Sequence, residues 1–347
     1  MSGVQQITVA ADEGDQRLDR WLRRRFPQLG QGQIERMCRK GELRVDGGRI
    51  KPASRVEAGQ VVRVPPIPDA AAAPTERRAP EISDSDARMM RGVVLYSDSH
   101  LVAINKPPGL PTQGGTGQAR HVDGLAAALA VDGEGPRLVH RLDRDTSGVL
   151  LMARSRVMAK ALAEAFRHRD TRKIYWAACA GVPAPRMGTI RYGLVKAPGH
   201  GAGGENEKMR PVHPDEIART PGAQRATTEY AVLDALGTRA AWLALVPVTG
   251  RTHQLRAHMA AVGHPIAGDG KYGGSGQENL GDGWGAGLGG AVSRKLHLHA
   301  RSLTFAHPAT GARLTITAPL PEHMARTWDL LGWSAADVPA DPFEADA

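Results

Sequence analysis

The sequence predicts an α+β protein in two folded parts, a small basic α/β domain followed by a larger domain built on a mixed, largely antiparallel central sheet with flanking helices. Three observations support this fold class. The chain has 347 residues, which is enough for two domains. Positive charge is concentrated near the N-terminus. After residue 91, segments typical of strands predominate and do not alternate regularly with helical ones.

The charge of the chain favours a polyanionic partner. The formal net charge is +9 and the isoelectric point is about 9.9. Residues 15–64 hold 13 Lys or Arg against 6 Asp or Glu, so most of the excess, a net +7, lies in that segment. Cys38 and Cys179 have no disulfide or metal-ligand spacing. With no apolar run of membrane-spanning length and no signal pattern, we expect a cytoplasmic protein without a membrane partner.

Residues 15–65 are expected to form the small domain. Apolar residues have helical spacing before Pro27 and again over residues 31–40. Short strands then flank a turn at Asp46-Gly47-Gly48. Arg17-Leu18-Asp19-Arg20-Trp21-Leu22 and the run from Arg39 to Gly47 make this segment resemble the S4 RNA-binding domain.

The excess of cations in this domain indicates phosphate contacts rather than a merely solvated face, because few acidic residues match them. We assign RNA binding to six of these side chains: Arg24, Arg36, Arg39, Lys40, Arg44 and Lys51.

Residues 66–90 are rich in Pro, Ala and acidic side chains without apolar periodicity, which predicts a flexible linker. Residues 91–325 then form the larger domain, and residues 326–347 are expected to be a frayed Ala/Asp-rich tail. Strands are expected over 93–96, 101–104, 149–153, 174–179, 227–233, 241–247 and 314–318, and helices over 157–169 and 253–262.

The first candidate for chemistry is Asp143, a carboxylate between Arg141 and Arg144 just before an apolar strand. Neighbouring cations keep such a carboxylate ionised and available as a nucleophile or base. An isolated Asp-Arg-Asp would more often be an ion-paired turn. However, His140-Arg141-Leu142-Asp143 followed by Thr146-Ser147-Gly148 resembles the catalytic motif of the RluA-type pseudouridine synthases. The resemblance implies the pseudouridine synthase fold, catalysis by Asp143, and entry of Arg141 into the RNA stack as the base leaves.

The second candidate is Tyr175 in the run Lys173-Ile174-Tyr175 at the start of a strand. Alone, it would be read as a half-buried strand tyrosine. The run resembles the family's Lys-x-Tyr motif, which implies that Tyr175 is the active-site tyrosine. Its ring would stack on the uracil, and its hydroxyl would serve in proton transfer.

The third candidate is the run Gly250-Arg251-Thr252-His253-Gln254-Leu255-Arg256, which passes from a strand into a helix. We expect Thr252 to cap that helix, whose free N–H groups suit a phosphate. The run resembles a second family motif, which implies that Arg256 pairs with Asp143 and that Leu255 packs beneath the base. Arg251 and His253 are assigned to RNA contact. Outer motifs, such as Asn105–Gly109, Gly263–Asp269 and Lys271-Tyr272-Gly273, are expected to be structural.

Metal binding is the rival interpretation for the histidines of this region. His253 and His258 lie five residues apart, about 140° around a helix, and no His-Glu-x-x-His motif occurs. The glycine-rich stretches at 199–204 and 273–290 lack the context of a phosphate-binding loop. We therefore expect neither a metal nor a small-molecule cofactor.

The resemblance covers roughly residues 15–66 and 91–325. It implies a monomeric isomerase that converts specific uridines of 23S rRNA to pseudouridine, with 23S rRNA or a large-subunit assembly intermediate as its partner. A branch of the family that modifies other 23S rRNA uridines is the close alternative. A non-catalytic RNA-binding or ribosome-assembly protein on the same fold, and a metal-dependent hydrolase of RNA, remain as alternatives of other classes.

Overall fold

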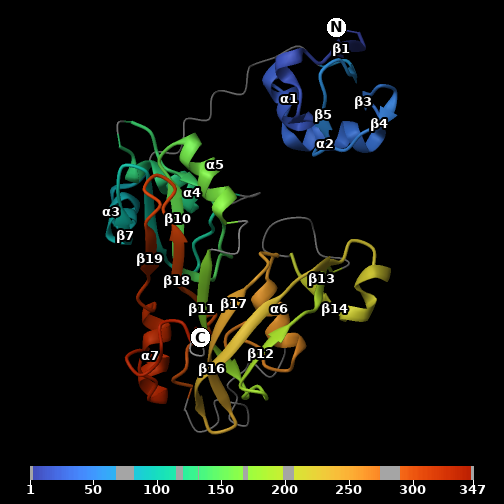
Figure 1. Cartoon of the computed structure of the whole chain (residues 1–347). Coiled ribbons are helices and arrows are strands. Elements are labelled where there is room, and N and C mark those ends of the chain that lie inside the picture. Colours follow the sequence, from blue (N-terminus) through green and yellow to red (C-terminus); the bar gives the residue numbers. More distant parts are fainter. Residues whose placement is uncertain are drawn as a thin grey trace. The chain divides into compact units, whose positions relative to one another are not determined.

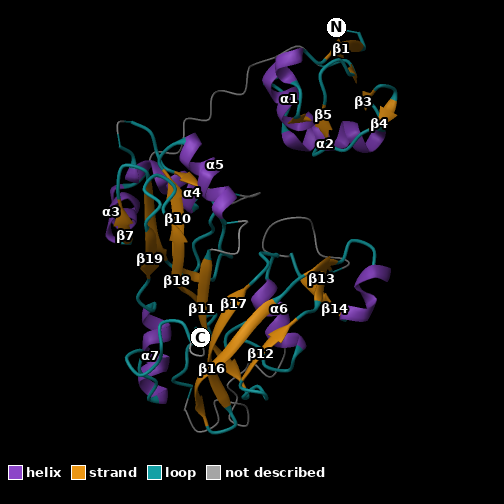
Figure 2. Cartoon of the chain, in the orientation of Figure 1, coloured by secondary structure: helices purple, strands orange, loops and turns teal. Residues whose placement is uncertain are grey.

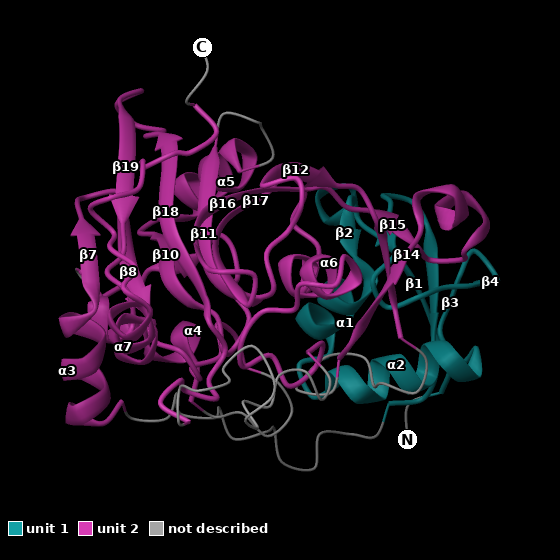
Figure 3. Cartoon of the chain, turned by 90° about the horizontal axis from the view of Figure 1, so that it is seen from below, with its two compact units in different colours: residues 1–81 teal, residues 82–347 magenta. Residues whose placement is uncertain are grey.

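The computed structural model describes residues 3–67, 82–114, 120–131, 133–166, 171–197, 207–273 and 290–344. The chain divides into two compact units, residues 1–81 and 82–347 (Figure 3). Most of the predicted linker, residues 68–81, lies outside the described residues, as do most of the glycine-rich stretches, at 198–206 and 274–289.

The first unit packs two helices, α1 (Leu18–Arg25) and α2 (Gln31–Lys40), against short strands. A four-stranded sheet has the order β1-β6-β3-β4 and is formed by β1 (Gln5–Thr8), β6 (Val61–Val64), β3 (Arg44–Val45) and β4 (Gly48–Arg49). β2 (Gln16–Arg17) pairs separately with β5 (Arg55–Val56). Trp21, Leu22 and Ile34 are fully buried in the core. Asp46 and Gly47 have φ values of 48° and 76°, as a tight hairpin between β3 and β4 requires.

The compact first unit extends beyond both ends of the predicted small domain, residues 15–65. β1 pairs with β6 along its whole length, from Gln5 opposite Val64 to Thr8 opposite Val61, so the unit begins well before residue 15. The short, polar β1 becomes recognisable only through its partner strand. At the other end, Ile67 is buried in the core of this unit, so the linker does not begin at residue 66.

The second unit is built on a ten-stranded sheet, and the predicted fold class is confirmed (Figure 2). Its main path is β12-β16-β17-β11-β18-β10-β8-β7, with β19 on β18 and β9 on β10. The strands are β7 (Val94–Ser97), β8 (Leu101–Lys106), β9 (Arg137–Leu138), β10 (Ser147–Ala153), β11 (Arg172–Ala180), β12 (Met187–Ile190), β16 (Thr228–Leu236), β17 (Ala240–Pro247), β18 (Leu298–Ala306) and β19 (Arg313–Thr317). All the seven predicted strands correspond to strands of this sheet, but the prediction missed its central strand, β18.

Helices cover both faces of each half of this sheet (Figure 1). Over β8 and β10, α3 (Asp84–Gly92) and α4 (Val122–Leu125) pack on one face and α5 (Arg156–Ala165) on the other. Over β11 and β17, α7 (Glu322–Leu331) packs on one face and α6 (Gln254–Ala261) on the other. Alternation along β17 explains the division, because Trp242 lies with α7 whereas Leu243 lies with α6.

A smaller sheet adjoins α6. It has the order β14-β13-β15 and consists of β13 (Gly193–Lys196), β14 (Met209–Val212) and β15 (Gln224–Arg225). The short 3-10 helices are η1 (Ala11–Glu13), η2 (Ala126–Leu129) and η3 (Pro214–Arg219). Among the helices that the structure describes, none is long and apolar enough to cross a membrane.

The second unit extends beyond the predicted limits of 91 and 325. The hydroxyl of Ser83 caps α3 by accepting the N–H of Asp86 at 3.1 Å, and Met90 in α3 is fully buried. Residues 84–90 are therefore folded and do not belong to a linker. The predicted frayed tail is also wrong up to residue 344, because Trp328 and Trp333 are buried against the sheet.

Candidate active site

Asp143 lies in the loop of residues 139–146, which we call the Asp143 loop, between β9 and β10. β10 and β18 run parallel here over two residue pairs, whereas the other pairings of the ten-stranded sheet among described residues are antiparallel. The close approach requires glycine at position 148, because a Cβ atom there would lie 2.2 Å from the carbonyl oxygen of Ala300. The loop thus ends at the junction between the two halves of the sheet.

Two buried side chains hold the backbone on either side of Asp143. The hydroxyl of Thr112 donates to the carbonyl of Leu142 at 2.7 Å and accepts the N–H of the same residue at 3.2 Å. The Lys106 ammonium donates to the carbonyls of Arg144 and Leu110 at 2.8 Å each and of Pro107 at 3.0 Å. Burial lowers the pKa of Lys106 to about 7, although the charges of Asp145 and Asp143 oppose this shift.

Arg256, on α6, joins Asp143 to a second carboxylate. Its Nη1 atom lies 3.4 Å from Oδ2 of Asp143, whose side chain is 28% exposed. Its Nε and Nη2 atoms each lie 2.7 Å from an oxygen of Asp269, whose side chain is 0% exposed. The hydrogen bonds to Asp269 and the charges of both carboxylates raise the pKa of Arg256 above its usual value, although burial opposes them. The guanidinium is therefore held as a cation beside Asp143.

Tyr175 lies on β11, opposite Leu245 of β17 and Ala300 of β18. It packs against the same apolar cluster as Leu255, which is buried. Burial and the charge of Asp143 raise the pKa of Tyr175 well above its usual range, so its hydroxyl remains protonated near neutral pH. The structure thus brings Asp143, Tyr175, Arg256 and Leu255 to one place.

The start of α6 differs from the prediction. The helix begins at Gln254, its N-cap is His253, and no side chain caps it, so the predicted cap by Thr252 is wrong. Gln254 closes the turn instead. Its side-chain oxygen accepts the hydroxyl of Thr249 at 2.7 Å and the N–H of Arg251 at 3.1 Å.

The other predicted RNA-contact residues differ in their exposure. Arg141 and Arg251 are exposed, and Arg251 donates to the carbonyl of Arg225 at 3.4 Å. His253 is mostly buried, with Nε2 3.8 Å from Oδ2 of Asp143. The six basic side chains of the first unit are all exposed: Arg24, Arg36, Arg39, Lys40, Arg44 and Lys51.

Several histidines near the site have structural partners. Nε2 of His140 accepts the N–H of Leu151 at 2.9 Å, and burial lowers the pKa of His140 to about 3. Nδ1 of His258 lies 2.9 Å from the hydroxyl of Thr228. In the part of the chain that the structure describes, no group of three or more His, Cys, Asp or Glu residues could hold a metal ion.

Reasoning from the sequence missed Lys106, Thr112 and Asp269 as site residues. Lys106 and Asp269 lie in motifs that were interpreted as structural. Lys106 reaches the site through hydrogen bonds to backbone carbonyls, and Asp269 reaches it through its ion pair with Arg256. The glycine that precedes Asp269 is the sequence feature that indicates a constrained turn there. Gly268 has a φ of 73°, and a Cβ atom at this position would lie 2.0 Å from the carbonyl oxygen of Lys295, so the turn accepts only glycine.

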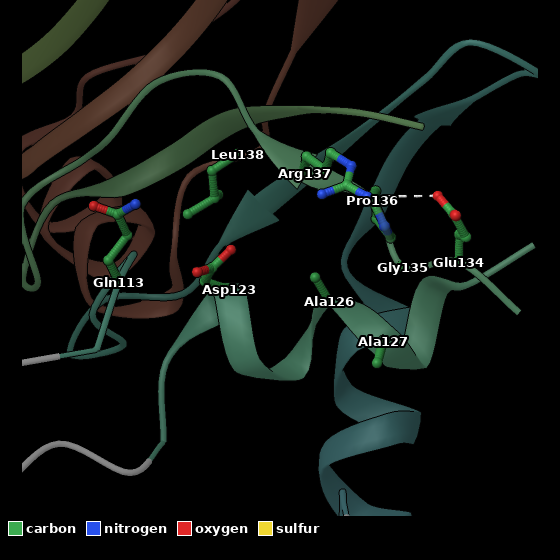
Figure 4. Close-up of a pocket in the computed structure, with 9 residues that line it drawn as sticks. All are labelled: Gln113, Asp123, Ala126, Ala127, Glu134, Gly135, Pro136, Arg137 and Leu138. Atoms are coloured by element: carbon green, nitrogen blue, oxygen red, sulfur yellow. Dashed lines mark ion pairs between the residues drawn. The ribbon is translucent and has the colours of Figure 1, made fainter. Parts of the chain in front are cut away.

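A separate hollow of about 510 Å³ lies over α4 and β9 (Figure 4). Arg137 and Glu134 form an ion pair of 3.5 Å at this hollow, and both side chains are substantially exposed. Asp143, Tyr175 and Arg256 do not line it, so it is distinct from the candidate site.

Comparison with known proteins identifies the same two parts. Residues 100–261 match the RNA pseudouridylate synthase family, and residues 16–62 match the S4 domain. The chain is 35% identical over 331 residues to ribosomal large subunit pseudouridine synthase C of Salmonella typhi, covering 94% of this chain and 97% of that protein. It is 36% identical over 326 residues to the protein of the same name from Escherichia coli K12, covering 93% and 95%.

A solved structure agrees with this relationship. The human RNA pseudouridylate synthase domain containing 4 protein is 31% identical, with a TM-score of 0.57, over 71% of this chain and 95% of that one. The chain therefore belongs to the RNA pseudouridylate synthase family and has an S4 domain ahead of its synthase unit.

Proposed function

We propose that this synthase converts uridines of 23S rRNA, in the large ribosomal subunit, to pseudouridine. We propose further that it is a ribosomal large subunit pseudouridine synthase C, called a C-type enzyme below. Two findings support the choice of substrate: the likeness to the C-type relatives spans nearly the whole chain, and the S4 domain presents exposed cations. The single observation that supports catalysis is the convergence of Arg256 and the half-buried Tyr175 on the partly exposed carboxylate of Asp143.

The reaction breaks the N1–C1′ bond of uridine, rotates the base and joins C5 to C1′. The C5 hydrogen leaves as a proton and N1 gains one, so no oxidant or energy source is consumed. In the proposal, Asp143 acts on the sugar of the flipped nucleotide, either by adding to C1′ or by removing a sugar proton. The buried guanidinium of Arg256 stabilises the negative charge of this carboxylate and orients it.

The remaining residues bind the extruded nucleotide in this proposal. Tyr175 stacks on the uracil and Leu255 supports it from below, while the exposed Arg141 fills the gap left in the RNA stack. Arg251 and His253 contact the RNA near the start of α6. We propose that the protein acts as a cytoplasmic monomer on 23S rRNA or on a large-subunit assembly intermediate.

Tritium release from rRNA that carries C5-tritiated uridine tests the reaction. Wild type should release tritium in the presence of EDTA, and Asp143→Asn should release none while folding normally. Asp145→Asn is the matched control, because it changes an exposed carboxylate two residues away and should retain activity. Equal release by wild type and Asp143→Asn would refute the role of Asp143, and loss of release with EDTA would favour a metal-dependent reaction.

Mapping of pseudouridine in rRNA tests the substrate. A strain that lacks this protein should lose pseudouridine at C-type positions of 23S rRNA and regain it with the wild-type gene. Loss at other 23S rRNA uridines would identify the alternative branch of the family. An unchanged map would instead favour a non-catalytic role in ribosome assembly.

A further inference from the structure

His253 lies between Asp143 and Tyr272, a tyrosine to which the proposed reaction assigns no role. Its Nε2 atom is 3.8 Å from Oδ2 of Asp143, and its Nδ1 atom is 2.9 Å from the hydroxyl of Tyr272. The side chain is 10% exposed. The backbone of His253 has a φ of 52°, in the left-handed region that residues other than glycine rarely adopt. Such an outlier beside a catalytic carboxylate suggests that the direction of this ring matters for function.

The hydrogen bonds of Tyr272 determine which imidazole nitrogen bears the proton. The Tyr272 oxygen accepts the backbone N–H of Met209 at 2.9 Å, which leaves its own O–H to be donated. Among the described residues, Nδ1 of His253 is the acceptor within reach of this hydroxyl. If Nδ1 accepts, the proton of a neutral ring is on Nε2, toward the Asp143 carboxylate. The opposite tautomer would direct a lone pair at that carboxylate and leave the hydroxyl without an acceptor.

The surroundings favour the neutral ring. Burial is the largest influence on the pKa of His253 and lowers it, and the charges of Arg256 and Lys271 act in the same direction. The charges of Asp143 and Asp269 oppose them. Tyr272 stays protonated, because burial raises its pKa to about 12. Its ring also lies 5.3 Å from the Arg256 guanidinium, so Tyr272 contacts both basic neighbours of Asp143.

The contacts of Asp143 are unequal between its two oxygens. Arg256 and His253 both approach Oδ2, at 3.4 and 3.8 Å. The described residues make no comparable contact with Oδ1. A carboxylate held through one oxygen presents the other to a nucleotide in a defined direction, and orientation of this kind accelerates a reaction.

We propose that Tyr272 and His253 are positioning residues for Asp143: the Tyr272 hydroxyl donates to Nδ1 of His253, and the Nε2–H dipole of His253, directed at Oδ2 from 3.8 Å, attracts that oxygen so that Oδ1 faces the uridine. The role in turnover rests on the proposed function, because it assigns the reacting carboxylate to Asp143. The hydrogen-bond arrangement does not depend on that function and can be measured in the free protein.

Nitrogen NMR of histidine-labelled protein tests the arrangement. In wild type at neutral pH, Nδ1 of His253 should have the chemical shift of an unprotonated nitrogen and Nε2 that of a protonated one. A His253→Gln variant assigns the signals. In Tyr272→Phe the donor to Nδ1 is lost, so the Nδ1–H tautomer or the imidazolium should increase and the pKa of His253 should rise. A protonated Nδ1 and an unprotonated Nε2 in wild type would overturn the proposal.

Kinetics tests the consequence for turnover. Tyr272→Phe should lower kcat by up to about 10²-fold with little change in KM, because the carboxylate is less well directed. The acid limb of its pH profile should move to higher pH as the pKa of His253 rises. His253→Gln, which keeps an N–H donor, should be more active than His253→Leu. Tyr230→Phe is the matched control, because it removes a hydroxyl that donates to the Pro185 carbonyl at 3.0 Å.

The two proposals fail in different ways. A Tyr272→Phe variant with wild-type kcat and pH profile would overturn the positioning role, even if wild type is an active synthase. A wild type that releases no tritium from any rRNA would overturn the proposed function, whereas the NMR result would still decide the hydrogen-bond arrangement.

Discussion

Arg256 binds Asp269 more tightly than it binds Asp143. Two nitrogen–oxygen distances of 2.7 Å join Arg256 to Asp269, whereas 3.4 Å separates it from Asp143. Because the guanidinium is planar, a bidentate pair on one edge fixes the direction of its remaining nitrogen. Asp269 thus orients Arg256, and Asp143 keeps part of its surface open to a substrate.

Asp269→Asn should destabilise the protein and reduce turnover together. Removal of one charge from a buried ion pair leaves the other without compensation and costs about 3–5 kcal/mol. We expect a lower midpoint of thermal unfolding and a lower kcat in the tritium-release assay. Asp145→Asn, at an exposed position, should unfold like wild type. If Asp269→Asn matched wild type in both measurements, the orienting role of Asp269 would be wrong.

Thr112→Val should impair the Asp143 loop while keeping the shape of the side chain. The substitution removes a donor and an acceptor that both serve Leu142, leaving buried backbone groups unsatisfied at a cost of about 1–3 kcal/mol. We expect a decrease in kcat that exceeds any change in KM, measured by steady-state tritium release. Thr112→Ser retains the hydroxyl and should stay close to wild type. Equal effects of the two substitutions would show that the hydrogen bonds of the Thr112 hydroxyl do not hold the Asp143 loop.

Lys106 should make stability depend on pH in the alkaline range. Its pKa is about 7 in the folded protein and 10.5 in the unfolded chain, so unfolding takes up a proton between these values. Stability from this group therefore rises with pH across that window and is lost as pH falls toward 7. The free energy of unfolding of wild type minus that of Lys106→Met, measured by denaturant titration, should increase from pH 7 to 10. A flat or decreasing difference would contradict the lowered pKa of Lys106.

The sequence predicted which residues meet at the candidate site better than it predicted the contacts between them. Motif resemblance singled out Asp143, Tyr175 and Arg256, which the fold brings to one site although more than a hundred residues separate Asp143 from Arg256. Asp269 was missed as the bidentate partner because nothing in local periodicity shows which aspartate a buried arginine will meet. Such a pairing depends on the tight turn at Gly268 and on the packing of α6.

The errors in secondary structure have a related cause. The central strand β18 was missed because His299, Arg301 and Ser302 interrupt its apolar alternation, and the fold buries His299 by giving it the Ser147 hydroxyl as a partner at 2.9 Å. The tail was expected to fray because it is rich in Ala and Asp. Trp328 and Trp333 nevertheless pack on Trp242, a contact with a strand some ninety residues away.

Substitution of exposed cations in the S4 domain should weaken rRNA binding in a salt-dependent manner. The structure gives Arg24, Arg36, Arg39 and Lys51 no ion-pair partner among the described residues, so their charges are available to phosphates. Each lost phosphate contact should lower the slope of log affinity against log salt by about 0.7–0.9. The variant with all four changed to Gln should therefore show a clearly flatter slope, measured by filter binding of rRNA at several salt concentrations. Arg55→Gln is the control for single substitutions, because Arg55 already pairs with Asp15 at 2.8 Å. This substitution should change the slope less than Arg24→Gln does. A slope unchanged by the fourfold substitution would refute the assignment of RNA binding to these side chains.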